Sequence, residues 1–242
     1  MAEQQNSVRL FTSKQVNYFT LPLPSAHHWN EFTPTQYTLV TEFRCGDDVD
    51  CTETKFGMRC IAVQDKKFYL DGRQISLRGT IDCAQFPLTG YPAMDKGAWL
   101  QRLGTAKEYG LNHVRFHAWC PPEAAFAAAD ELGMMMQPEL SHWNPRTAFL
   151  DQESLDYYTA ELRQILRCLA NHPSFVMLTF GNELWTDEEG IRRIHSLLDM
   201  ARAQDSTRLY SWGSNVFYGT KGCDPESDFY TSTQYFTHMI RG

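Results

Sequence analysis

From Ile75 to the C-terminus, short apolar runs alternate with longer amphipathic segments. The runs predict strands at 75–82, 112–117, 134–139, 175–180 and 209–213, with 228–231 as a sixth candidate. The intervening segments predict helices at 96–109, 121–132, 154–169 and 191–203. This repeated strand–helix order demands a parallel sheet with right-handed crossovers. No glycine-rich phosphate loop follows the first strand, so the pattern favours a barrel over a nucleotide-binding doubly wound sheet.

The number of strands limits how much of a barrel this chain can form. A closed barrel needs eight strand–helix units and typically about 250 residues. The chain has 242 residues and only about six candidate strands, so we expect an incomplete (β/α)8 TIM barrel. Before it, 37–43 alternates apolar and polar residues, 46–50 is a turn, and Asp71-Gly72 predicts a type I′ hairpin. These short strands are too few to close a β-sandwich.

Composition excludes several classes of protein. The net charge of −7 argues against nucleic acid as the main partner. No run of about 18 apolar residues is present, and the N-terminus lacks a signal pattern. We therefore expect a soluble protein, and the sequence does not distinguish the cytoplasm from the periplasm. The seven cysteines include no CxxC pair, which weakens a zinc site. Mostly buried free thiols are expected rather than a Cys45–Cys51 disulfide. We expect no cofactor and no metal.

The stretch 174–185 carries the main catalytic candidate. Its apolar run ends abruptly at Gly181-Asn182-Glu183, as expected for a strand buried on both faces. Parallel α/β folds place their chemistry at the C-terminal ends of such strands, so Glu183 is the first catalytic candidate. The alternative is a Glu that only caps the next helix. Asn182 and Trp185 favour catalysis on sugars, because amides bind hydroxyls and aromatic faces stack on sugar C–H surfaces.

The chain carries the motifs Phe56-Gly-Met-Arg59, His113-Val-Arg-Phe-His117 and Gly181-Asn-Glu183 in this order. Together with the motifs between them, they resemble glycoside hydrolase family 2, which includes β-galactosidases, β-glucuronidases and β-mannosidases. Phe56-Gly-Met-Arg59, Phe68-Tyr-Leu-Asp-Gly-Arg73 and Ile75-Ser-Leu-Arg-Gly79 resemble the junction between that family's immunoglobulin-like sandwich and its barrel. His113-Val-Arg-Phe-His117 resembles the second barrel strand, and Asn171-His-Pro-Ser174 with Gly181-Asn-Glu183 resembles the fourth. The resemblance implies a partial immunoglobulin-like segment at 1–62 and a truncated TIM-barrel catalytic domain at 63–242. It also implies that Glu183 is the acid/base catalyst.

The resemblance and the strand ends together suggest roles for other residues. Asn182 is expected to bind the sugar 2-hydroxyl. Arg115 and His117 lie two apart on one strand and so face the same side, where Arg115 either binds the nucleophile carboxylate or forms a buried structural ion pair.

Trp119 and Trp143 are candidates for sugar-subsite walls, with packing as the alternative. Glu139 is a rim candidate whose pairing with His142 at a metal is a weaker alternative. Asp82 is expected to orient a loop or a substrate hydroxyl. Arg146 is one candidate for pairing with the carboxylate of a uronic acid.

The expected function is retaining hydrolysis of β-linked sugars from their non-reducing ends. Such chemistry needs two carboxyl groups about 5–5.5 Å apart. The family's nucleophile is a Glu at the end of the seventh strand, so that role is assigned to no residue here. We therefore expect the isolated chain to be inactive. One alternative is a non-catalytic carbohydrate-binding or interaction module. Another is a barrel completed by a second chain or by the rest of the native chain.

Overall fold

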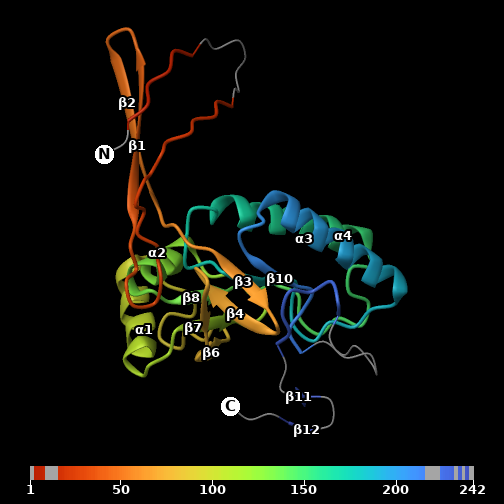
Figure 1. The fold of residues 1–242 in the computed structure, drawn as a ribbon. Coiled ribbons are helices and arrows are strands. Elements are labelled where there is room, and N and C mark those ends of the chain that lie inside the picture. The colour runs from red at the N-terminus through yellow and green to blue at the C-terminus, as the bar shows by residue number, and fades with distance from the viewer. Residues whose placement is uncertain (1–2, 9–15, 216–223, 232–233, 236–237, 240–242) are drawn as a thin grey trace.

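Parallel strands form a curved sheet at the centre of the molecule (Figure 1). The computed structural model describes residues 3–8, 16–215, 224–231, 234–235 and 238–239. In order across the sheet, the strands are β6 (Gly79–Asp82), β7 (His113–Phe116), β8 (Met135–Gln137), β9 (Met177–Thr179) and β10 (Leu209–Ser211). Parallel bridges Met136–Phe175 and Glu139–Thr179 join β8 to β9, and the bridge Ser214–Thr231 continues the sheet beyond β10. This is the expected arc of a TIM barrel.

Four helices connect these strands, as the sequence predicts. They are α1 (Lys96–Glu108), α2 (Glu123–Leu132), α3 (Gln152–Cys168) and α4 (Glu188–Gln204). Asp95, Asp151 and Asp187 cap α1, α3 and α4 by accepting hydrogen bonds from backbone N–H groups of the first turn. Helix α2 ends at Gly133, whose φ of 69° is the left-handed conformation that a C-terminal cap requires.

Buried apolar side chains lie on both faces of the sheet. Because neighbouring residues of a strand point to opposite faces, Val114, Met136 and Leu178 pack against the helices. Met135, Met177 and Leu209 point to the other face, where Trp29, Ile61 and Leu70 cover them. The fully buried Trp29 also donates its indole N–H to the carbonyl of Asp130 over 2.8 Å. The N-terminal part therefore packs into the barrel.

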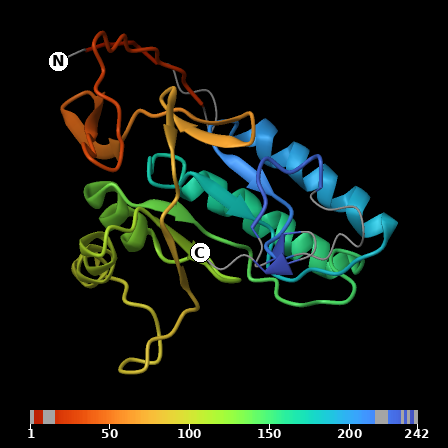
Figure 2. The same ribbon diagram turned by 60° about the horizontal axis from the view of Figure 1, so that its bottom comes forward.

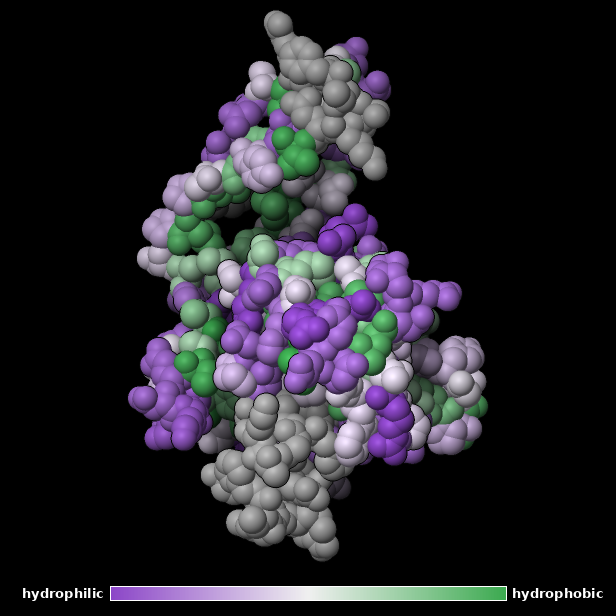
Figure 3. Space-filling model, turned by 90° about the vertical axis from the view of Figure 1, so that its right-hand side faces the viewer, coloured by the Kyte–Doolittle hydropathy of each residue, from purple (hydrophilic) through white to green (hydrophobic). Residues whose placement is uncertain are grey.

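Antiparallel strands make up the N-terminal part. They are β1 (Tyr37–Cys45), β2 (Asp48–Phe56), β3 (Ile61–Gln64), β4 (Lys67–Leu70) and β5 (Arg73–Ile75); the short β11 (Gln234–Tyr235) and β12 (His238–Met239) pair near the C-terminus. Asp71 and Gly72 have φ values of 51° and 75°, which confirms the predicted type I′ turn. The β1–β2 hairpin projects from the body (Figure 1). Figure 3 shows hydrophobic side chains exposed on this projecting part.

The junction between hairpin and barrel uses the motif Phe56-Gly-Met-Arg59. Arg59 donates to the carbonyls of Pro173 over 3.0 Å and of Phe175 over 2.6 Å, next to β9. A Cβ on Gly57 would lie 2.5 Å from the ring of Pro173, so only glycine permits this approach. The motif therefore fastens the N-terminal segment to the start of β9. The domain division at residue 62 stays a prediction.

The cysteines correct one expectation. Cys45 and Cys51 are free and exposed rather than buried, as are Cys60, Cys83 and Cys168, while Cys120 is half-buried. Cys223 lies outside the described residues. The prediction of mostly buried thiols was wrong: the hairpin that carries Cys45 and Cys51 is exposed on both faces, and the other three exposed cysteines lie at or next to the ends of strands or helices. Among the described residues, no helix is long and apolar enough to cross a membrane.

Candidate active site

The C-terminal ends of the parallel strands bring four polar side chains together. Arg115 lies on β7, Glu139 follows β8, Asn182 follows β9 and Ser214 follows β10. All four are buried, with Glu139, Asn182 and Ser214 fully inaccessible to solvent. Buried polar groups must find partners within the protein, so these side chains bind one another.

The guanidinium of Arg115 and the carboxylate of Glu139 form the centre of this network. Arg115 Nε donates to Glu139 Oε1 over 2.7 Å, and Arg115 Nη2 lies 3.3 Å from Glu139 Oε2. Ser214 Oγ donates to Oε1 over 2.6 Å, and the backbone N–H of Ala118 donates to Oε2 over 2.7 Å. Both oxygens of Glu139 are therefore occupied. Arg115 therefore forms a buried ion pair, which is one of its two expected roles, and its binding of a nucleophile carboxylate stays a prediction.

Asn182 is oriented by the same arginine. Its Oδ1 accepts from Arg115 Nη2 over 2.5 Å. A guanidinium only donates, so the amide oxygen must face Arg115 and the amide nitrogen must face away. That nitrogen is buried and has no hydrogen-bond partner among the described residues. Asn182 thus holds a buried amide donor whose direction is fixed by Arg115, and its role at a sugar hydroxyl stays a prediction.

Glu183 lies on a tight turn directly after this amide. Its φ is 53°, a left-handed conformation that is costly for a residue with a side chain. Gly181 has a φ of 139°, and a Cβ there would lie 2.2 Å from the carbonyl oxygen of His142. The backbone N–H of Glu183 donates to the carbonyl of Ser214 over 2.8 Å. Packing on both sides therefore holds the half-buried Glu183 at the end of β9.

The loop after β8 runs beside the turn that carries Glu183. Asn182 N donates to His142 O over 2.9 Å, and Asn144 N donates back to Asn182 O over 2.9 Å. Trp143, which is 63% exposed, lies with its ring 5.9 Å from the ring of His117. These two rings form an exposed aromatic edge next to Asn182. Their roles in substrate binding stay predictions.

Trp119 and Asp82 lie in a packed region behind the rim. The ring of Trp119 contacts those of Phe86 and Phe116, and its indole N–H donates to the carbonyl of Asp82 over 3.1 Å. The buried carboxylate of Asp82 pairs with Arg102 of α1 over 2.7 Å and accepts from the backbone N–H of Ala84. Asp82 therefore orients the loop after β6, which Figure 2 shows extending from the body. Roles for either residue at a substrate stay predictions.

His142 packs among aromatic rings rather than pairing with Glu139. Its ring stacks on Tyr158 at 4.4 Å and meets the edge of Phe149 at 4.9 Å. Burial lowers the pKa of His142 to about 4. The described residues contain no cluster of three or more His, Cys, Asp or Glu side chains that could hold a metal ion.

Ser214 is the network residue for which the sequence suggested no role. The sequence signal was its place in 212–215, at the end of a predicted strand. A lone serine at a strand end is common, so its link to Arg115 and Glu139 required the fold. His113 and Thr179 lie on the same strands and face as the network residues, nearer to the N-terminal ends of the strands. Each has one buried side-chain atom without a hydrogen-bond partner among the described residues. Burial and the Arg115 charge lower the pKa of His113 to about 4.

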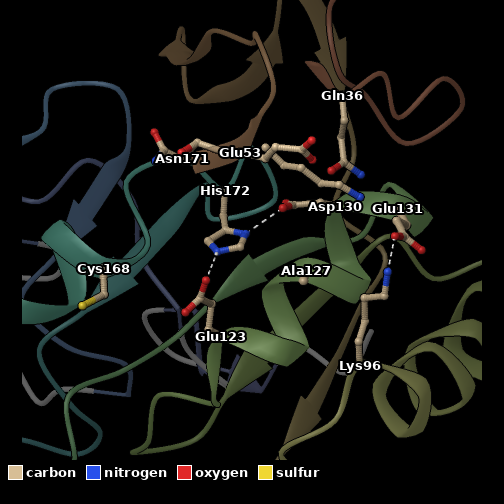
Figure 4. Close-up of a pocket in the computed structure, with 12 residues that line it drawn as sticks. Gln36, Glu53, Lys96, Glu123, Ala127, Asp130, Glu131, Cys168, Asn171 and His172 are labelled. Atoms are coloured by element: carbon tan, nitrogen blue, oxygen red, sulfur yellow. Dashed lines mark hydrogen bonds and ion pairs between the residues drawn. The ribbon is translucent and has the colours of Figure 1, made fainter. Parts of the chain in front are cut away.

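A separate cavity of about 450 Å³ lies between β2, α2 and the turn after α3. Figure 4 shows His172 at its centre between Glu123 and Asp130, with Lys96 paired to Glu131. None of the candidate site residues lines it. This cavity is therefore distinct from the network of Arg115, Glu139, Asn182 and Ser214, and most of its charged side chains pair with one another.

Comparison with known families agrees with this geometry. Residues 61–240 match the model "Glycosyl hydrolases family 2, TIM barrel domain", and residues 2–59 match the model "Glycosyl hydrolases family 2". The chain belongs to glycoside hydrolase family 2. This chain is 29% identical over 160 residues to a putative β-glucuronidase of Formosa agariphila, and the match covers 65% of this chain and 19% of that protein. It is 26% identical over 196 residues to a β-galactosidase of Bacteroides ovatus, covering 77% and 23%.

Solved structures of the family share the fold. A β-glucuronidase of Parabacteroides merdae superposes with a TM-score of 0.74 at 25% identity, over 86% of this family 2 chain and 26% of that one. The apo structure of β-glucuronidase 3 of Bacteroides uniformis superposes with a TM-score of 0.74 at 25% identity, over 86% of this chain and 27% of that one. The chain spans about a fifth of the length of the curated relatives named above. The partial immunoglobulin-like segment and incomplete barrel agree with these matches.

Proposed function

We propose that this chain is the acid/base half of a retaining β-glycosidase that removes sugars from the non-reducing end of its substrate. The observation that supports it most is the pairing of Asn182 and Glu183 at the end of β9. There, a directed amide donor precedes a carboxyl held by a strained turn. The names of the relatives, β-glucuronidase and β-galactosidase, support β-linked sugars as substrates.

In this proposal Glu183 acts twice. It first protonates the departing glycosidic oxygen, and it then deprotonates the water that releases the sugar from the enzyme. Asn182 donates its free amide N–H to the sugar 2-hydroxyl. Arg115 keeps that amide turned the right way by occupying its oxygen.

The nucleophile is assigned to no residue of this chain. Glu139 is the nearest candidate in the network, but it is fully buried and both of its oxygens accept hydrogen bonds. A nucleophile needs a free oxygen about 5–5.5 Å from the acid/base carboxyl. The proposal therefore includes that the 242-residue chain by itself turns over no glycoside.

The test compares the 242-residue chain with the whole reading frame that contains it, each assayed on 4-nitrophenyl β-glycosides. We expect the longer protein to release the β-anomer first, and Glu183→Gln to slow its turnover by about 10²–10⁴-fold. Azide should restore Glu183→Ala on activated substrates by attacking the glycosyl-enzyme. Release of the inverted sugar, or full activity of Glu183→Gln, would contradict the assignment. Turnover by the 242-residue chain alone would contradict the proposal that its nucleophile lies on no residue of this chain.

A further inference from the structure

A second group beside Glu183 is formed by Arg146 and Trp185. Arg146 lies on the loop after β8, and Trp185 lies two residues after Glu183. Two backbone hydrogen bonds hold these segments together: Trp185 N donates to Pro145 O over 3.1 Å, and Ala148 N donates to Trp185 O over 2.8 Å. With the bonds between 142–144 and Asn182, they form a continuous ladder. The position of Arg146 relative to the Glu183 turn is therefore set by the backbone.

The side chains of this pair form a cation–π contact. The guanidinium carbon of Arg146 lies 4.9 Å from the centre of the Trp185 ring. Contact with an aromatic face restricts the guanidinium while leaving its N–H edge open for hydrogen bonds. That edge presents two parallel donors, which match the two oxygens of a carboxylate.

Arg146 has no ion-pair partner in the part of the chain that the structure describes. By contrast, Arg192 and Arg193 on the neighbouring helix α4 both pair with Glu189, over 2.7 and 2.9 Å. A guanidinium that the fold holds beside the Glu183 turn, with no carboxylate partner from the described residues, is suited to an anionic ligand.

We propose that Arg146, in contact with the Trp185 ring, binds a carboxylate of the substrate, so that the enzyme acts on acidic glycosides. This inference rests on the proposed function, because it places the carboxylate next to the glycosidic bond that Glu183 protonates. The carboxylate belongs either to the sugar that is cleaved, as in a uronide, or to the leaving group. A neutral glycoside gains nothing from the charge of Arg146.

The test measures binding to the 242-residue chain by NMR titration. The probes are methyl β-D-glucuronide and methyl β-D-galacturonide, each paired with its neutral glucoside or galactoside. We expect Arg146→Gln to weaken uronide binding about tenfold or more, as for the loss of a charge-assisted hydrogen bond, and neutral glycosides to bind unchanged. Arg146→Lys should fall between, because lysine keeps the charge and loses the planar fork. The control Arg192→Gln should bind every probe as the parent chain does.

A second pair of probes, 4-carboxyphenyl and phenyl β-D-glucoside, identifies the source of the carboxylate. If Arg146→Gln weakens only the 4-carboxyphenyl compound, the carboxylate belongs to the leaving group. Equal binding of acidic and neutral probes, or an equal loss of both in Arg146→Gln, would overturn the inference and leave the proposed function standing. Failure of every glycoside to bind would overturn both.

Discussion

Replacing Glu139 by glutamine tests the buried network most directly. The substitution keeps the size of the side chain and removes its charge. One amide oxygen can still accept from Arg115 and Ser214, but the new NH₂ group then faces the backbone N–H of Ala118 and Arg115 Nη2, which are both donors. The change thus leaves Arg115, which is 8% exposed, without its counter-charge.

The magnitude follows from burial. Removing one partner of a buried ion pair typically costs about 3–5 kcal/mol, because the other charge stays desolvated. An orphaned backbone N–H costs about 1–3 kcal/mol when nothing replaces its acceptor. These costs overlap at one site, so we expect the free energy of unfolding to fall by about 3–5 kcal/mol in total. That is a large share of the about 5–15 kcal/mol typical of a native protein.

Urea denaturation at pH 7, followed by tryptophan fluorescence, gives this difference for Glu139→Gln. The control is Glu131→Gln, since Glu131 pairs with Lys96 at the surface and should cost less than about 1 kcal/mol. Arg115→Met combined with Glu139→Leu should be less destabilised than the sum of the single changes, because no buried charge then remains. A loss below about 1 kcal/mol for Glu139→Gln would refute the reasoning that this pair is buried and coupled.

Three further predictions follow from the site and its surroundings. Gly181→Ala should lower the free energy of unfolding by about 2–3 kcal/mol, since its Cβ would overlap the carbonyl of His142; an unchanged urea midpoint would contradict this. The pKa of His142 is lowered to about 4 by burial, so the neutral ring contributes stability above pH 6.5 that is lost as the pH falls toward 4. His142→Phe should therefore lose less stability than the parent chain between pH 7 and pH 5 in urea melts. Cys45 and Cys51 should react with Ellman's reagent in the native protein, whereas Cys120 should react slowly, because burial raises the pKa of its thiol; mass spectrometry of labelled peptides checks this.

Much of the fold follows from local patterns in the sequence. Apolar runs and amphipathic segments predicted β6 to β10 and the four helices to within a few residues, whereas the sixth candidate strand at 228–231 forms only an isolated bridge at Thr231. Asp71-Gly72 predicted a hairpin turn, because left-handed backbone conformations restrict which residues fit. These patterns depend only on residues that are close in the sequence, so they can be recognised without knowledge of the fold. They also pointed to strand ends, and hence to Glu183 and Asn182 as candidates.

Tertiary structure decided which of those residues meet. Arg115 binds Glu139, Asn182 and Ser214, which lie 24, 67 and 99 positions away in sequence. No periodicity encodes such contacts, because they depend on how successive strands register across the sheet. The exposure of Cys45 was missed for the same reason, since burial depends on what covers a strand. The sequence determined the elements and the chemistry at their ends, while packing decided the partner, burial and orientation of each group.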